Sequence, residues 1–218
     1  MDKQQQRALY GPGWVEVILG VGLSLLVGVI LGAIWLVFKP VVVAKELSTT
    51  AAPGSVFYYP GATNANAART WMRKKQILAE GQAGEFVLTE EELNAWAADT
   101  MKSSAPDATS TVAPSQINFR IADGILQIAT PVSVDLLGLS LPVIIQARGD
   151  FEKQDDVFTF VPREMYLGSL ATHRIPGLAE RTLRYITQVH PFPQDVTDGW
   201  KKLAAVSVEG KQLRVTLP

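Results

Sequence analysis

The chain has 218 residues and a nearly balanced charge, with 20 Lys and Arg against 21 Asp and Glu, and it contains no cysteine. The absence of cysteine excludes disulfides, thiol catalysis and thiolate metal sites. Beyond residue 46 the chain carries 16 basic and 18 acidic residues. The resulting net charge of about −2 argues against a nucleic-acid partner.

The first 13 residues are polar and end in the helix breaker Gly11-Pro12-Gly13, which predicts a short tail at residues 1–13. Residues 17–38 then read VILGVGLSLLVGVILGAIWLVF without a single charge. A bilayer core about 30 Å thick needs roughly 20 such residues, whereas a cleaved signal peptide has an apolar region of only about 7–15. We therefore predict a retained transmembrane anchor over residues 14–39. We expect a single-pass protein of the cell membrane, with the tail inside and the C-terminal domain extracytoplasmic.

Four small residues recur at every fourth position of the anchor, namely Gly20, Ser24, Gly28 and Gly32. That spacing places them in one stripe, along which a partner helix can approach closely. The alternative is that glycine is simply frequent in membrane helices. The stripe indicates helix–helix contact, with a second copy of the chain or with another protein.

Residues 40–61 have no sustained periodicity and contain several Gly and Pro, so we expect a juxtamembrane linker with a short strand near residues 56–59. The extracytoplasmic domain is then expected at residues 62–218. It opens with a helix over residues 62–80, capped by Thr63 or Asn64 and followed by Gly81. Its apolar positions are Ala68, Trp71, Met72, Leu78 and Ala79, opposite a basic face of Arg69, Arg73, Lys74 and Lys75. That basic face suits solvent, or as a second interpretation lipid headgroups.

A second helix is predicted directly after a short strand at residues 85–88. Thr89 and Glu92 have the spacing of a capping box, and the acidic first turn suits the helix dipole. Capping accounts for two of the three adjacent glutamates without a metal or an acid–base role. Residues 102–115 are rich in Ser, Ala, Pro and Thr, which predicts a loop.

From residue 116 to about 170 the apolar period changes to two, and turn signals recur at Asp123-Gly124, near Gly138 and at Gln154-Asp155-Asp156. This pattern predicts an antiparallel meander of long strands. The turn near Gly138 is unusually apolar over residues 136–145. We expect a helix to cover it; otherwise it forms an exposed patch for lipid or a partner.

The remaining chain predicts a third helix from Ile175-Pro176-Gly177 to the prolines at 191 and 193, a short helical turn at residues 195–202, and a closing hairpin over residues 205–217. The fold class is therefore α+β: an N-terminal transmembrane helix followed by a curved antiparallel sheet packed on two or three helices. No segment repeats at the period of a solenoid.

Catalytic chemistry has little support in the sequence. The two histidines, His173 and His190, lie 17 positions apart, and neither has a second ligand at metal spacing. No H-E-x-x-H, P-loop or G-x-S-x-G pattern occurs. We expect a protein that is not an enzyme, with no catalytic residue, metal or cofactor.

Several short motifs occur together and in a definite order. LTEEELN at residues 88–94 precedes IADG at 121–124, FTFVP at 158–162 and YLGSL at 166–170, and an amphipathic helix and a hairpin follow. With a single N-terminal anchor, this order resembles the YpmS-like family of bacterial membrane-anchored proteins and, more distantly, the tubular lipid-binding superfamily. The resemblance covers residues 85–218, and the basic helix before them has no counterpart in the pattern.

The resemblance implies a long curved sheet around a helix, which leaves an apolar groove for lipid chains. The residues permit such a groove, because incomplete filling between a curled sheet and a helix leaves a cavity. We place nine apolar side chains beside it: Phe119, Ile121, Ile128, Val134, Ile145, Phe158, Phe160, Leu178 and Ile186. For any single one of them, a place in an ordinary core is the simpler interpretation.

The leading hypothesis is a membrane-anchored extracytoplasmic protein that binds lipid or another apolar ligand non-covalently near the bilayer. The alternative is a structural or assembly subunit of a membrane protein complex, docked through its transmembrane helix.

Overall fold

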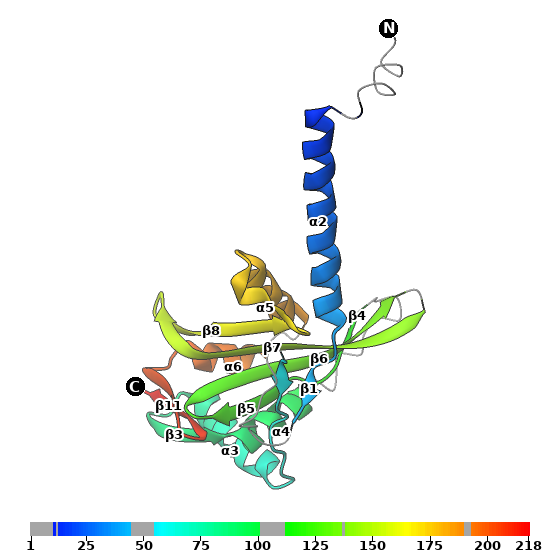
Figure 1. Ribbon diagram of the computed structural model, residues 1–218. Helices are drawn as coiled ribbons and strands as arrows, with labels where there is room; N and C mark the ends of the chain where they lie inside the picture. The colour runs from blue at the N-terminus through cyan, green and yellow to red at the C-terminus, as the bar shows by residue number, and fades with distance from the viewer. Residues whose placement is uncertain (1–10, 12, 45–54, 101–111, 137, 190–192) are drawn as a thin grey trace. The chain divides into compact units, whose positions relative to one another are not determined.

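The computed structural model describes residues 11, 13–44, 55–100, 112–136, 138–189 and 193–218. The chain divides into two compact units, Met1–Val37 and Phe38–Pro218. Helix α2, Trp14–Phe38, accounts for the described part of the first unit (Figure 1). Its 25 residues extend ~37 Å at 1.5 Å each, and it is the one described helix long and apolar enough to cross a membrane. The predicted helix at this position is confirmed.

The second unit begins with a pair of short parallel strands, β1 (Val42–Val43) and β2 (Phe57–Tyr58). The amides of Val42 and Ala44 donate to the carbonyls of Val56 and Tyr58, both at 3.0 Å. Tyr58 and Tyr59 are buried. The compact unit thus starts at Phe38, whereas the sequence placed the domain boundary after residue 61. The reason is that residues 55–61 find partners on the sheet that lie far away in the chain.

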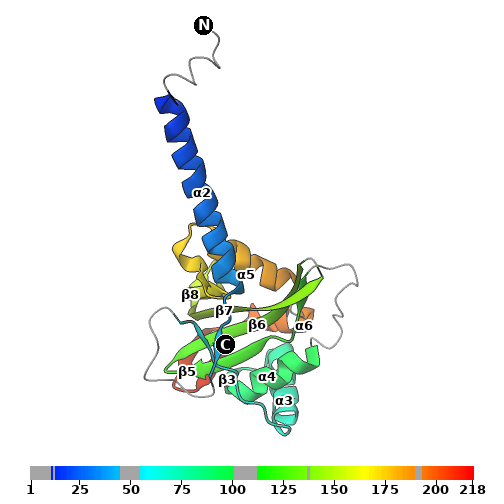
Figure 2. The same ribbon diagram turned by 45° about the vertical axis from the view of Figure 1, so that its right-hand side comes forward.

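Helices α3 (Ala67–Glu80) and α4 (Glu90–Thr100) pack side by side (Figure 2). Helix α3 starts five residues later than predicted, because Asn64 accepts the amide of Asn66 in a turn outside the helix. Gly81 ends α3 with a φ of 68°, as its position in the sequence indicates. Trp71 is buried, but Met72 is 62% exposed, so the predicted apolar face is wrong at that residue.

The capping box at the start of α4 is confirmed. The Thr89 amide donates to Glu92 Oε2 at 2.9 Å, and the Glu92 amide lies 3.4 Å from Thr89 Oγ1. The pairing satisfies two backbone donors that the helix itself cannot satisfy.

The main sheet has six strands in the order β4-β6-β7-β8-β9, with β5 paired to β6. Its long strands twist and curve without closing into a barrel (Figure 1). The antiparallel meander is confirmed, with turns at Asp123-Gly124 and Asp155-Asp156 where the φ angles are positive. The strands are β4 (Val112–Pro114), β5 (Asn118–Ala122), β6 (Ile125–Leu136), β7 (Leu139–Gln154), β8 (Val157–Leu167) and β9 (Leu170–Ala171).

Two expectations about this sheet are wrong. Strand β4 lies inside the predicted loop at 102–115, because its three residues pair with Val132–Val134 of β6. The remaining loop residues up to 111 lie outside the described part. At the apolar turn, Leu139 is 65% exposed, so no helix covers it there.

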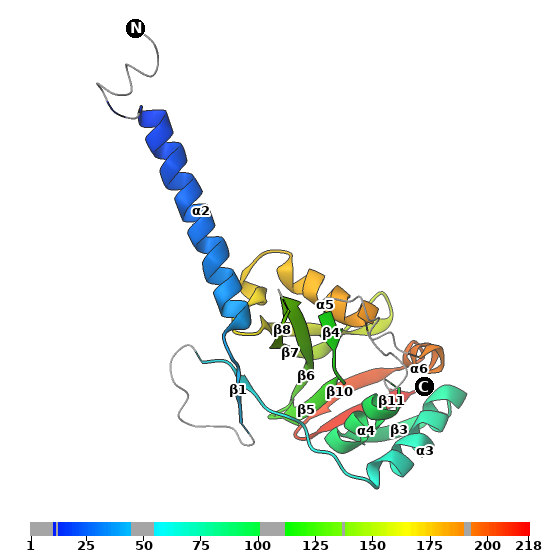
Figure 3. The same cartoon turned by 90° about the vertical axis from the view of Figure 1, so that its right-hand side faces the viewer.

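The closing hairpin, β10 (Ala205–Glu209) and β11 (Gln212–Leu217), is confirmed. It does not extend the meander; β11 pairs antiparallel with β3 (Gly84–Thr89) in a separate sheet ordered β10-β11-β3. Figure 3 shows this small sheet beside α4. The C-terminal strand β11 therefore pairs with a strand from the early part of the domain, and the two belong to the same small sheet.

A 3₁₀ turn, η2 (Thr172–Arg174), leads into helix α5 (Leu178–Val189), and α6 (Gln194–Trp200) follows. Helix α5 begins after the predicted Ile175-Pro176-Gly177, because Ile175 is extended and Gly177 has a φ of 73°. The short helix predicted over 195–202 is confirmed as α6.

Candidate functional site

One face of the main sheet carries aromatic and aliphatic side chains in register across four strands. Phe119 of β5 lies opposite Ile128 of β6, which lies opposite Ala147 of β7 and then Met165 of β8. Because side chains on paired strands share a face, these residues line one side of the sheet. Ala147 is the small member of the row, and it leaves space above the sheet.

Beside this row the register of β7 with β8 shifts between Arg148 and Gly149, where Arg163 of β8 is an extra residue without a partner on β7. A Cβ at Gly149 would lie 2.1 Å from the carbonyl oxygen of Val161, so only glycine allows β8 to approach so closely. Bulges increase strand bending and twist.

A cavity of about 360 Å³ lies on this face of the sheet. Side chains from the main sheet, from β3 and β11, and from helices α3, α4, α5 and α6 surround it. Almost all of the lining is apolar; its polar members are three threonines, at 159, 187 and 197, and Lys201. The apolar lining comprises Trp71, Leu78, Leu88, Leu93, Trp96, Ile117, Phe119, Leu126, Ile128, Ala147, Phe151, Val157, Phe158, Phe160, Leu183, Ile186, Val196, Trp200 and Leu213.

Five of the nine predicted ligand residues line the cavity: Phe119, Ile128, Phe158, Phe160 and Ile186. The other four, Ile121, Val134, Ile145 and Leu178, do not line it. Ile121 and Ile145 are only 2% and 3% exposed and belong to the packed core. Their alternation in the strand has the same period as that of the lining residues, so periodicity alone does not separate the two groups.

Sequence reasoning missed the part of the lining that comes from the helices. The rings of Trp71 and Trp96 pack at a tilt of 51° with their centroids 5.7 Å apart, and the Trp96 ring lies 5.8 Å from that of Phe119. These rings form one wall of the cavity. The available signal is one tryptophan in each of these two helices, of which Trp71 lies on the apolar face predicted for its helix.

The opposite wall is a second aromatic group from β7, β8 and α6. The Phe151 ring lies 5.3 Å from Trp200 and 5.8 Å from Phe160. Helix α6 itself sits tightly on α3, because a Cβ at Gly199 would lie 2.7 Å from the Leu78 carbonyl oxygen. The short helix is thereby fixed at the edge of the cavity.

Buried polar groups hold the helices to the sheet around the cavity. Asn94, 1% exposed, donates to the carbonyls of Ala62 and Phe119 and accepts the Phe119 amide at 2.7 Å. Glu90 accepts the amides of Ala62 and Ile121, while Glu92 caps α4 and pairs with Lys74 at 2.6 Å. These carboxylates therefore position α4.

His173 has a structural environment. Its Nδ1 lies 3.1 Å from the Met165 amide and 3.0 Å from the Met165 carbonyl oxygen, and its ring packs edge-on against Tyr166. Burial, with Glu164 second, raises the pKa of the Tyr166 hydroxyl. His190 lies outside the described residues. Among the residues that are described, no three His, Asp or Glu side chains gather as metal ligands would.

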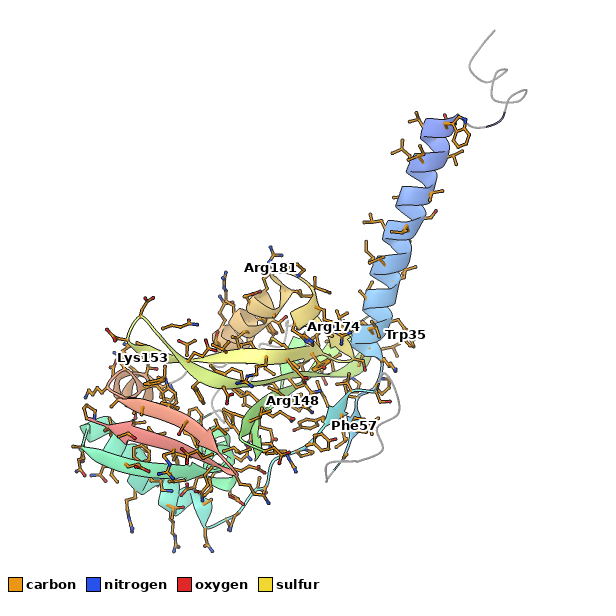
Figure 4. The ribbon with its side chains drawn as sticks, turned by 60° about the vertical axis from the view of Figure 1, so that its left-hand side comes forward. Trp35, Phe57, Arg148, Lys153, Arg174 and Arg181 are labelled. Atoms are coloured by element: carbon orange, nitrogen blue, oxygen red, sulfur yellow. The ribbon has the colours of Figure 1, made fainter. Side chains whose placement is uncertain are left out.

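The other face of the sheet binds residues 57–60, here called the strap. The Tyr59 ring lies between two guanidinium groups, 5.5 Å from Arg120 and 5.7 Å from Arg148. Both arginines also donate to strap carbonyls, Arg120 to Pro60 at 3.1 Å and Arg148 to Phe57 at 3.2 Å (Figure 4). Gln127 donates to the Tyr59 carbonyl at 3.2 Å. The polar face is thus covered, and the cavity lies on the apolar face only.

The predicted helix-contact stripe, Gly20, Ser24, Gly28 and Gly32, lies on α2 and is exposed along its length. A Cβ at any of the three glycines would meet no atom within 4 Å. In comparisons with known proteins, the chain matches no protein-family model and no curated protein sequence.

Proposed function

We propose that the protein is a single-pass membrane protein whose extracytoplasmic domain holds an apolar ligand, such as a lipid acyl chain, non-covalently in the cavity. The cavity and its lining carry this proposal. A volume of about 360 Å³ falls within the range of roughly 300–1,000 Å³ that is typical of small-molecule sites. It lies near the lower end, so it suits one chain or a compact apolar molecule better than a two-chain lipid.

The chemistry of the lining supports an apolar ligand. A cavity lined by aliphatic and aromatic groups offers water few hydrogen-bond partners and instead favours hydrocarbon. The threonines and Lys201 are the polar groups available to the end of such a ligand. The ligand would be shielded from water without any bond being made or broken.

The anchor supports the membrane location. Helix α2 is uncharged over residues 17–38, and Trp14 and Trp35 near its two ends are 84% and 63% exposed. Indole rings favour the headgroup region of a bilayer. The proposed orientation, with the domain outside, rests on the long C-terminal remainder and not on the nearly equal flanking charges.

The experiment compares the full-length protein with two matched variants of α5. Leu183→Trp adds volume inside the cavity, whereas Gln188→Trp adds the same group at an exposed position of the same helix. Each protein is purified in one detergent, and lipids are extracted and quantified by mass spectrometry. Lipid that surrounds helix α2 is present in all three proteins, so it does not contribute to the difference between them.

We expect one lipid species in stoichiometric amount with the native chain and with Gln188→Trp, and its loss from Leu183→Trp at an unchanged circular dichroism spectrum. Equal lipid content in all three proteins would contradict the proposal.

A second candidate function, an assembly subunit, is favoured by the four small residues in register on α2. Its test is Gly28→Ile with Gly32→Ile, which fills the stripe. Loss of a co-purifying chain would support this function, and unchanged co-purification would exclude contact through the stripe. Lipid bound in the cavity is expected to remain in either case.

A further inference from the structure

A contact inside the second unit fixes one edge of the domain close to where the chain leaves α2. Lys39 directly follows Phe38, the last residue of that helix. Ser169 Oγ donates to the Lys39 carbonyl at 3.3 Å. Because an extended residue spans at most about 3.6 Å, the six residues from Ser169 to Ile175 span no more than about 22 Å. Ser169 therefore contacts the residue at the exit of α2, and position 175 lies within about that distance of it.

Three arginines lie exposed on this segment and on the helix that follows: Arg174, Arg181 and Arg184. We call these three arginines the basic face. Figure 4 shows Arg174 and Arg181 on one side of β8, with Arg148 and Phe57 on the other. Two large apolar side chains accompany them, Ile175 at 41% and Tyr185 at 37% exposure.

Within the described part of the chain, none of the three arginines forms an ion pair. The acidic residue on α5 is Glu180, and the nearby Glu164 lies 3.6 Å from Arg148. The basic face thus keeps a net positive charge on a domain that is slightly acidic overall.

The four basic residues of helix α3 differ from the basic face in their ion pairs. Lys74 pairs with Glu92 at 2.6 Å and Lys75 with Asp195 at 2.8 Å, so both serve internal contacts. The other two, Arg69 and Arg73, are exposed and form no ion pair with a described residue. Half of the charge that the sequence placed on α3 is thus used within the domain.

We propose that the basic face docks on the anionic headgroups of the bilayer in which α2 is anchored. The proposal rests on the membrane location proposed above. Arginine clusters next to a membrane anchor are attracted to acidic lipids, and each contributes about a fivefold increase in the docked population. Ile175 enters the headgroup layer, which is roughly 5–8 Å deep on each side of the hydrocarbon core.

Docking also has a consequence for the cavity. Helix α5 presents Arg181 and Arg184 outward and Leu183 and Ile186 into the cavity. One helix thus forms part of both surfaces. Contact of the basic face with lipid brings the cavity to the source of its proposed ligand.

The test uses the full chain in lipid nanodiscs. The protein has no cysteine, so Ile175→Cys introduces a unique site for a polarity-sensitive fluorophore. Nanodiscs of neutral phosphatidylcholine are compared with nanodiscs containing about one third phosphatidylglycerol. Quenching by nitroxide-labelled lipid reports contact of position 175 with the bilayer.

We expect a blue shift and strong quenching in the anionic nanodiscs, and a large decrease in both between 50 mM and about 500 mM salt, because screening weakens the attraction. Arg181→Glu with Arg184→Glu should abolish the anionic-lipid effect. The matched charge reversal Arg69→Glu with Arg73→Glu on α3 should leave it intact.

The outcomes separate the two proposals. Failure of the chain to enter nanodiscs would overturn the membrane location and docking together. Insertion with retained cavity lipid, but identical fluorescence in both nanodiscs, would overturn docking alone. Loss of the effect only in the α3 variant would also overturn it, by assigning contact to α3.

Discussion

The indole Nε1 of Trp200 donates a hydrogen bond to the backbone carbonyl of Phe158 at 2.7 Å. The bond joins α6 to the start of β8, and the side chains of both residues line the cavity. The Trp200 ring also packs on Phe151, 5.3 Å away. One residue thus fastens the hairpin of β7 and β8 to the helix beside it.

Replacement of Trp200 by Phe keeps an aromatic ring and removes the donor. We expect the free energy of unfolding to fall by about 0.5–1.5 kcal/mol, the usual net value of one hydrogen bond. Cavity lipid should be retained less well, because the hairpin is no longer fixed. Urea titration followed by circular dichroism measures the first effect. Asp198→Asn, at an exposed position of the same helix, should change the midpoint little; an equal loss in both variants would contradict this explanation.

Asn94 is expected to be far more sensitive. Asn94→Leu has a similar shape but leaves the buried amide and carbonyl of Phe119 without their partner. Each orphaned group costs about 1–3 kcal/mol, so the unfolding free energy should fall by roughly 2–5 kcal/mol. Asn64→Ala removes a bond at an exposed turn and should cost less than about 1 kcal/mol. Similar losses in thermal denaturation would show that Asn94 is not the link between α4 and β5.

The contact of Lys75 with Asp195 joins α3 to α6 and should depend on pH. The hydrogen bond from Lys75 holds the pKa of the Asp195 carboxyl below its usual value. A depressed pKa in the folded state stabilises the protein above the unfolded pKa near 3.9, and this stability is lost as the pH falls through the folded value. Both side chains are more than a third exposed, so the pair is worth under about 1 kcal/mol.

Asp195→Asn should therefore lower the urea midpoint slightly at pH 7 and match the native protein at pH 2–3. A difference that persists or grows at low pH would contradict this sign. Asp156→Asn, whose carboxylate is almost fully exposed, is the control with little change at either pH.

The strap is expected to loosen when its arginine partners are removed. Arg148→Met keeps the length of the side chain and removes one cation above Tyr59, together with the bond to Phe57. We expect hydrogen exchange of the Val42 and Ala44 amides to accelerate by roughly tenfold. The reason is that these amides donate to the carbonyls of Val56, next to the strap, and Tyr58, within it. Hydrogen exchange with mass spectrometry measures it. Lys153→Met on the same strand should not alter these amides.

Local pattern was sufficient to predict much of the fold. The capping box at Thr89 and Glu92, the Asp123-Gly124 turn and the period-two strands depend on neighbours in the chain, and each is confirmed. The pairing of β11 with β3 was not predictable, because it joins segments more than 120 residues apart. Strand β4 was missed for a different reason; its three residues include Pro114 and lie in a stretch whose composition is typical of a loop.

The candidate site shows the same limit. Phe119 and Ile121 alternate identically in sequence, yet one lines the cavity and the other is core, because helices cover the sheet unevenly. The cavity depends on how the helices and strands pack together, and Ala147, a small residue of β7, lines it. Nothing in the apolar pattern of the sequence singles this residue out.

The strap also determines how mechanical tension on the anchor would pass into the domain. A pull at Lys39 is transmitted to β1 and then through backbone hydrogen bonds to residues 56–58. From the strap it continues into β5, β6 and β7 through the side chains of Arg120, Gln127 and Arg148. A second route runs through the bond from Ser169 Oγ to the Lys39 carbonyl, at the turn between β8 and β9. Tension on the anchor would thus reach the main sheet at two places, through the strap and through this turn.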